Sequence, residues 1–157
     1  MDNGKRLPVC KAVLHFNTKK DEEVLVKVGV SAVDIAGARK NVESEIPEWD
    51  FDKVRKDART AWNNYLSKID ITTSDKEDKT IFYTALYHTA ISPNLFTDAD
   101  GRYLGMDLEV HQGDTINPLY TVFSLWDTFR ALHPLMTIID PNLNNQFINS
   151  LIRKHQE

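Results

Sequence analysis

The chain has 157 residues, and its 19 Lys plus Arg against 23 Asp plus Glu give a formal net charge of −4 with neutral histidines. Hydrophobic residues at 41% and charged residues at 27% are ordinary for globular domains, which excludes a disordered, collagen-like or coiled-coil chain. The sequence has no continuous basic stripe, and its longest mostly apolar run, 121–139, contains Asp127, Arg130 and His133, so neither a nucleic-acid partner nor a membrane span is expected.

The N-terminal segment is predicted to carry no export signal, because residues 1–6 are polar and lack an apolar region. Cys10 is the only cysteine, which excludes an internal disulfide and a cysteine-built zinc site. Apolar and polar side chains alternate between Val9 and Val30 and predict an antiparallel β-hairpin with residues 17–23 as its polar connection. Two strands are not stable alone, so their neighbours are expected upstream of Met1, in another chain, or not at all.

Helical spacing begins directly after this hairpin. The pattern Ser31-Ala32-Val33-Asp34 has the form of a capping box and predicts a short helix that runs through Ala38. Residues 41–50, which include a proline, are predicted to form a linker.

Two longer helices are predicted next. Apolar residues three and four apart predict the first, from about Asp52 to Lys68. A capping box at Ser74-Asp75-Lys76-Glu77 predicts the second. It is expected to stop near Ser92, because Pro93 disfavours helical geometry in the residue before it.

Residues 94–112 interrupt the helical pattern. Within them, Asp100-Gly101 between apolar flanks predicts a hairpin turn. Asn117-Pro118 predicts a further helix running toward Pro134, because proline is favoured at the first helical position. Asp140-Pro141 predicts the last helix in the same way.

Two patterns resemble metal sites, and neither meets its ligand requirements. Asp98 and Asp100 fit the third and fifth positions of a calcium loop, but that register places Phe96 at the first ligand position, so a plain Asp-Gly turn is expected. The five histidines include no His-x3-His pair, so a zinc site is not expected. His88, beside Tyr87 on an apolar helix, is expected to be a core residue.

The run Trp126-Asp127-Thr128-Phe129-Arg130 carries the most informative chemistry. On a helix, Trp126 and Arg130 share a face and Asp127 lies one residue round from Trp126. An aromatic ring can stack on the CH face of a sugar while charged groups bind its hydroxyls. The alternative is an Asp127–Arg130 ion pair beside a buried Trp126, and without further context this alternative is favoured.

Several ordered motifs together resemble glycoside hydrolase family 92. They are Phe82-Tyr83-Thr84-Ala85-Leu86-Tyr87-His88-Thr89, Ser92-Pro93-Asn94, the spaced Asp98, Asp100-Gly101, Tyr103 and Gly105, and the run from Tyr120 to Arg130 with His133-Pro134-Leu135. The resemblance identifies the chain as a member of this family of calcium-dependent, inverting, exo-acting α-mannosidases. Many members are secreted bacterial enzymes that degrade N-glycans, so a periplasmic or extracellular parent protein is implied.

The resemblance also implies the fold, which is mixed and mainly α. Residues 1–30 would be the end of an N-terminal β-sandwich domain, residues 31–50 an interdomain linker with a short helix, and residues 51–157 the start of an (α/α)6 barrel. Because the chain stops at Glu157 without a closing element, the barrel is expected to be incomplete. Apolar helix faces around Leu125, Phe129 and Leu132 would then lack cover, and association through them is possible.

In such enzymes one carboxylic acid protonates the leaving oxygen and a separate carboxylate activates water. The resemblance implies that this acid, this base and the principal calcium ligands lie beyond Glu157, so no catalytic or metal residue is assigned here and the chain alone is expected to be inactive. Its substrate-binding candidates are Asp127 as acceptor for mannose hydroxyls, Trp126 as a cavity wall, Arg130 as an orienting group, and His133 more weakly.

Two other functions stay open at this point: a noncatalytic carbohydrate-binding module and a structural remnant. Mannose-containing glycans are the implied partner for the enzyme, with α-1,2-linked mannose as the linkage that the family favours. The oligomeric state cannot be read from these residues.

Overall fold

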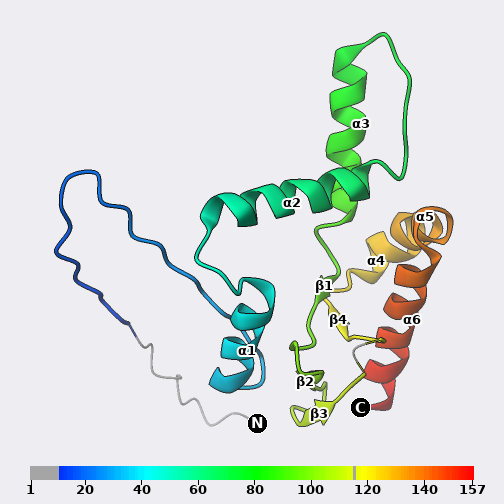
Figure 1. The fold of residues 1–157 in the computed structure, drawn as a ribbon. Coiled ribbons are helices and arrows are strands. Elements are labelled where there is room, and N and C mark those ends of the chain that lie inside the picture. The colour runs from blue at the N-terminus through cyan, green and yellow to red at the C-terminus, as the bar shows by residue number, and fades with distance from the viewer. Residues whose placement is uncertain (1–10, 115) are drawn as a thin grey trace.

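The computed structural model describes residues 11–114 and 116–157. Within them the chain is mainly helical, as predicted, with two small antiparallel strand pairs (Figure 1). In chain order the elements are α1 (Ile35–Glu45), α2 (Phe51–Leu66), α3 (Lys76–Thr89), β1 (Asn94–Leu95), β2 (Arg102–Leu104), β3 (Val110–Gln112), β4 (Tyr120–Thr121), α4 (Leu125–Asp127), the π-helix η1 (Thr128–Leu132), α5 (His133–Ile139) and α6 (Pro141–Gln156).

The predicted N-terminal β-hairpin is wrong for the described residues 11–30. The chain reverses where the amide of Glu22 donates to the carbonyl of Lys19, but no strand forms on either side of this turn. Figure 1 shows this segment extending away from the helices. Its valines are exposed, with Val28 at 76% and Val30 at 78%, so no sheet or core covers the alternating pattern that predicted the strands. Val9 lies outside the described residues.

Helix α1 begins and ends later than predicted. Its N-cap is Asp34, whose carboxylate accepts a hydrogen bond from the amide of Gly37 at 2.6 Å. The helix continues to Glu45, so the first half of the predicted linker 41–50 is helical. Asn41 explains the extension, because its amide group donates to the carbonyl of Val30 and to the carboxylate of Asp98, which holds the helix against a distant loop.

Helices α2 and α3 confirm two predictions. Each starts with an aspartate that accepts hydrogen bonds from the first turn, Asp50 for α2 and Asp75 for α3, so the cap of α3 lies one residue after the predicted Ser74. Helix α3 ends before Pro93, as expected. In Figure 1 the connection after α2 climbs away from it, and α3 runs back steeply toward the end of α2. The hydroxyl groups of Tyr65 and Thr89 lie 3.2 Å apart and join the two helices.

The predicted Asp100-Gly101 turn is present, but the strands on either side of it, β1 and β2, do not pair with each other. Gly101 has a φ of 85° and donates its amide to the carbonyl of Asp98 at 2.8 Å, a geometry that suits glycine. The β2–β3 pair instead closes across residues 105–109, with Tyr103 opposite His111. Strand β1 pairs with β4 in the other sheet.

The predicted helix start at Asn117-Pro118 is wrong. Strand β4 follows this proline, and the helix begins only at Leu125. Tertiary bonds explain the extended backbone: the amide of Leu119 donates to the Thr97 hydroxyl, and the amide of Tyr120 donates to the Ser150 hydroxyl. Leu119 is 2% exposed, so burial stabilises the same conformation.

The helical run beginning at Leu125 passes the predicted stop at Pro134 and continues to Ile139. Pro134 is the second residue of α5 and follows directly on the π-helix η1, so the proline lies at the junction of the two helix types. Helix α6 starts at Pro141 as predicted, capped by Asp140, whose carboxylate accepts from the amide of Leu143 at 3.0 Å.

The main apolar core lies between α5 and α6. Leu132, Met136 and Phe147 are buried there, which corrects the expectation that Leu132 lacks cover. Leu125 and Phe129 are exposed at 59% and 76%, as expected for an incompletely covered helix face. Among the described helices, none is both long and apolar enough to cross a membrane.

Candidate functional site

A cleft of about 390 Å³ lies between the C-terminal end of α3 and the segment that starts just after β4. It receives one side chain of the predicted site, Asp127, together with polar and small apolar groups from both sides. The lining residues are Ala85, His88, Thr89, Ser92, Val122, Ser124, Asp127, Thr128, Ala131, Leu132 and Leu135.

Asp127 is exposed at this cleft, and a neighbouring hydroxyl orients it. Ser124 Oγ donates a hydrogen bond of 2.6 Å to Asp127 Oδ2. Ser124 is also the N-cap of α4, and the Thr128 hydroxyl donates to its carbonyl oxygen at 3.0 Å. Within the described residues, Oδ1 of Asp127 has no hydrogen-bond donor from the protein. One oxygen is therefore held while the other can accept from a ligand.

The π-helix η1 starts immediately after Asp127 and spans Thr128–Leu132. Its wider turn shifts the helical register between α4 and α5, and such π segments occur often at functional sites. The shift places Thr128 and Leu132 inward, at 5% and 8% exposed, while Phe129 stays at 76%. No residue pattern in the sequence indicates this register change.

Trp126 and Arg130 lie on one face, as their four-residue spacing predicts, and their side chains stack on one another. The guanidinium carbon lies 4.4 Å from the centre of the indole ring, and neither side chain is among those that line the cleft. Trp126 is 71% exposed, so the alternative of a buried tryptophan is wrong. The alternative ion pair is also not observed among the described side chains, where Arg130 approaches the ring rather than the Asp127 carboxylate.

His133 is half-buried and is not among the residues that line the cleft. Its Nδ1 lies 2.8 Å from Oδ1 of the buried Asn144, and its ring packs edge-on against Phe147 with centroids 6.2 Å apart. The structure therefore separates the four predicted site residues: Asp127 lines the cleft, Trp126 and Arg130 form a stacked pair beside it, and His133 faces α6.

His88 lines the cleft, and the expectation that it is a core residue is wrong. Its helix buries Leu86 instead, so His88 turns to the exposed side, where its ring packs against that of Tyr87 at 5.6 Å. Ser92, also exposed, extends the same side of the cleft. Both residues belong to the family-like motifs of the sequence, but their spacing gave no sign of a site.

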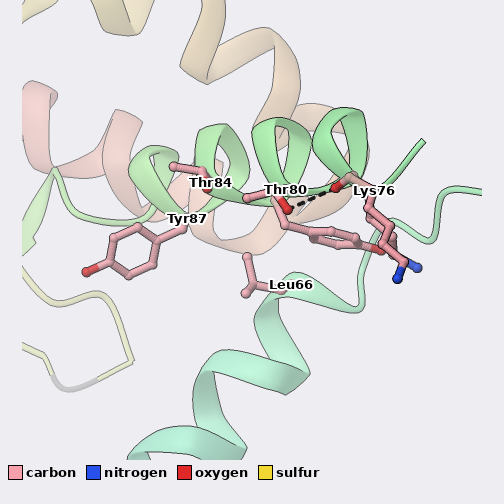
Figure 2. A pocket seen from close by; sticks show the side chains of 7 residues that line it. Leu66, Lys76, Thr80, Thr84 and Tyr87 are labelled. Carbon is pink, nitrogen blue, oxygen red and sulfur yellow. Dashed lines mark hydrogen bonds between the residues drawn. The ribbon is translucent and has the colours of Figure 1, made fainter. Parts of the chain in front are cut away.

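A larger hollow of about 580 Å³ runs along another face of α3 and contains none of the predicted site residues. Figure 2 shows it above Leu66 of α2, with Thr80, Thr84 and Tyr87 projecting from α3. Its polar groups are lysines, threonines and tyrosines, and it contains no carboxylate. The larger hollow thus contains no acidic side chain, whereas the smaller cleft contains Asp127.

The described residues contain no group of three His, Cys, Asp or Glu side chains that could hold a metal ion. The aspartates of the 98–101 turn are already bonded. Asp98 is 4% exposed and accepts from Ser31 Oγ at 2.6 Å and from Asn41 Nδ2 at 2.8 Å. Asp100 pairs with Lys40 and with Arg102, both at 2.9 Å. These carboxylates do not fit a calcium site, because their oxygens are bonded to protein groups.

Arg102 joins this turn to α1. It binds Asp34 through Nη1 at 2.7 Å as well as binding Asp100. The hydrogen bond from Arg102 lowers the pKa of Asp34 from 3.8 to about 2. The hydrogen bond from Lys40, followed by those from Arg102, lowers the pKa of Asp100 to about 2. The ion pairs among Asp34, Lys40, Asp100 and Arg102 form a network that connects α1 to the loop leading into β2.

Comparisons with a family model, with curated proteins and with solved structures all match glycosidases. The family model for the glycosyl hydrolase family 92 catalytic domain matches residues 37–157. An uncharacterized secreted glycosidase of Arthroderma benhamiae is 35% identical over 105 residues, which are 57% of this chain and 14% of that protein.

Two solved structures of Bacteroides thetaiotaomicron proteins also match. The family GH92 alpha-mannosidase BT3965 has a TM-score of 0.76 at 36% identity, over 81% of this chain and 17% of that one. The inverting mannosidase BT2199 has a TM-score of 0.74 at 32% identity, again over 81% and 17%. The chain thus spans 14% to 17% of the length of these relatives.

Proposed function

Because the chain belongs to glycosyl hydrolase family 92, we propose that it is part of an exo-acting α-mannosidase that hydrolyses α-linked mannose of N-glycans or mannans. The observation that carries the proposal is the placement of Asp127 in an open cleft, with one oxygen oriented by Ser124 and the other without a protein donor. The mannosidase BT3965, to which the chain is similar, has a solved complex with mannoimidazole. This supports a sugar of the mannose type as the ligand.

Asp127 is proposed to accept hydrogen bonds from mannose hydroxyls. A carboxylate is an acceptor only, and its bonds from hydroxyl groups are charge-assisted and short. The Ser124 bond fixes the carboxylate plane, so less side-chain entropy is lost when the sugar binds. Asp127 is thus a binding group in this proposal, and no proton transfer is assigned to it.

The other three candidates have different proposed roles. Trp126 forms a wall at the rim, supported by its 71% exposed indole, which offers a surface for the CH face of a sugar. Arg130 orients that indole by stacking on it rather than orienting Asp127. His133 acts indirectly, by fixing α5 to α6 through Asn144.

The chemical step is proposed to need groups outside this chain. Inversion requires a carboxylic acid and a separate carboxylate base with room for water between them. The lining of the cleft contains one carboxylate, that of Asp127. In this proposal the general acid, the general base and the calcium ligands belong to other parts of the parent enzyme, and the 157-residue chain binds mannose without hydrolysing it. A preference for α-1,2 linkages and a secreted parent, supported by the secreted fungal relative, belong to the same proposal.

Two measurements on the purified 157-residue chain test this function. Incubation with an α-1,2-linked mannose disaccharide and calcium is expected to release no mannose. Release of mannose would contradict the proposal that the chemical step needs groups outside this chain. An NMR titration with methyl α-D-mannopyranoside is expected to show weak binding that Asp127→Asn reduces at least tenfold, because a charge-assisted bond is replaced. Asp52→Asn, an equally conservative change on the exposed start of α2, serves as the control. Equal affinities for the wild type and Asp127→Asn would refute the role of Asp127.

A further inference from the structure

The polar side chains of the Asp127 cleft differ in whether the protein already satisfies them. Three hydroxyl groups are used internally: Thr89 Oγ1 donates to the carbonyl of Leu86 at 2.7 Å, and Thr128 and Ser124 donate to Ser124 O and Asp127 Oδ2. These groups shape the cleft, but their donor hydrogens are not available to a ligand.

Two polar side chains of the cleft are not used in this way. Within the described residues, neither the imidazole of His88 nor the hydroxyl of Ser92 has a hydrogen-bond partner from the protein, and both are exposed where they line the cleft. They come from the last turn of α3 and the residues after it, whereas Asp127 comes from α4. The cleft therefore has free hydrogen-bonding groups on two separate elements.

The two sides complement each other chemically. Each sugar hydroxyl both donates and accepts, whereas a carboxylate can only accept. Asp127 alone would leave the oxygen lone pairs of a bound sugar without donors from the cleft. A neutral imidazole carries one N–H donor and a serine hydroxyl carries another, so His88 and Ser92 can supply what Asp127 cannot.

We propose that His88 and Ser92 form a second hydrogen-bonding side of the sugar site, and that His88 donates to an oxygen of the mannose whose hydroxyls bind Asp127. The proposal rests on the proposed function of Asp127. Apolar lining groups, among them Ala85, Ala131 and Leu135, lie in the cleft together with the two polar sides. His88 is then a specificity-determining residue that touches the sugar.

The test uses the 157-residue chain and methyl α-D-mannopyranoside, with the dissociation constant measured by NMR titration. His88→Ala is expected to weaken binding about five- to tenfold, the effect of one neutral hydrogen bond. His88→Gln keeps a side-chain donor and is expected to recover part of this loss. Ser92→Ala is expected to weaken binding by a smaller factor. His155→Ala, the same change on an exposed histidine of α6, is the matched control and should bind as the wild type does.

The outcomes separate this inference from the function on which it rests. If the wild type does not bind the mannoside, or if Asp127→Asn binds equally well, both proposals fail. If Asp127→Asn loses binding while His88→Ala and Ser92→Ala keep the wild-type affinity, only the proposed role of His88 and Ser92 is overturned. A melting temperature measured for each variant shows whether it is folded. Should His88→Ala be unfolded, Ser92→Ala and His88→Gln decide the question.

Discussion

The guanidinium carbon of Arg130 lies 4.4 Å from the centre of the Trp126 ring. This contact divides the five-residue motif into two parts with separate tasks. Trp126 and Arg130 form a stacked pair on the exposed side of α4 and η1, while Asp127 turns to the cleft and is bound by Ser124. The guanidinium of Arg130 therefore contacts the Trp126 ring, whereas the Asp127 carboxylate contacts the Ser124 hydroxyl.

The stacked pair gives the first prediction. In a double-mutant cycle with Trp126→Ala and Arg130→Ala, we expect a coupling of about 0.5–1 kcal/mol in the free energy of unfolding, as for an exposed cation–π contact. Urea denaturation of the four proteins measures it. A coupling indistinguishable from zero would show that the two side chains do not hold each other in solution.

Gly37 gives the second prediction, which reverses an ordinary trend. Alanine in place of glycine usually stabilises a helix by roughly 1 kcal/mol. At position 37, however, an added Cβ would lie 2.3 Å from Asp98 Oδ2 and 2.8 Å from Ser31 Oγ, inside a buried hydrogen-bond network. We expect Gly37→Ala to lower the free energy of unfolding by about 1–3 kcal/mol through overpacking.

The control for Gly37→Ala is the same change in an Asp98→Ala background, where the obstructing carboxylate is gone. There the added methyl group should cost much less, so the two substitutions should be strongly non-additive in urea denaturation. A Gly37→Ala protein as stable as the wild type would contradict the close approach of α1 to the 98–101 turn.

The third prediction concerns acid. The pKa values of Asp34 and Asp100 are lowered from 3.8 to about 2, chiefly by hydrogen bonds from Arg102 and Lys40. A carboxylate with a lowered pKa stabilises the folded state above its ordinary pKa, and this stabilisation is lost as the pH falls through the folded-state value. The ion-pair network between α1 and the 98–101 turn should therefore persist at pH 4 and weaken progressively toward pH 2.

Carboxyl-carbon NMR of the two aspartates measures this directly, and both resonances should titrate near pH 2. Replacing Lys40 with methionine removes the largest cause of the shift at Asp100 and should move its titration upward. Titration of both groups near 3.8 in the wild type would mean that the ion-pair network does not form in solution.

His133 gives the fourth prediction, which distinguishes a structural role from a binding role. His133→Ala leaves the 6% exposed Asn144 without its ring partner, so we expect the free energy of unfolding to fall by about 1–3 kcal/mol. The dissociation constant for methyl α-D-mannopyranoside should change less than about twofold. A folded variant with tenfold weaker binding and wild-type stability would place His133 in the site instead.

Local sequence signals predicted the elements whose stability is mostly local. Helices α2, α3 and α6 each have an apolar periodicity and an aspartate near the first turn, and these signals located them to within a few residues. The elements that failed depend on distant partners. Leu119 stays extended because Thr97 and the core hold it, so the helix-start rule for Pro118 gave the wrong structure.

The candidate site was predictable only in part. The motif around Asp127 pointed to the cleft, but the π-helix that follows it has no counterpart in residue spacing. His88 was assigned to the core because its helix is apolar, and the choice of Leu86 as the buried residue depends on what packs against α3. Over the described residues 11–30 the predicted strands failed for a related reason, since an alternating pattern forms strands only where a sheet is available to pair with them.

The central claim is that mannose binds at the Asp127 cleft, and an amide NMR titration of the isotope-labelled chain with methyl α-D-mannopyranoside tests it most directly. The account predicts the largest chemical-shift changes at Ser124, Asp127, Thr128 and His88, with the amides around Lys76 and Lys79 of the larger hollow unaffected. Changes centred on that larger hollow, or no changes anywhere at high mannoside concentration, would contradict it.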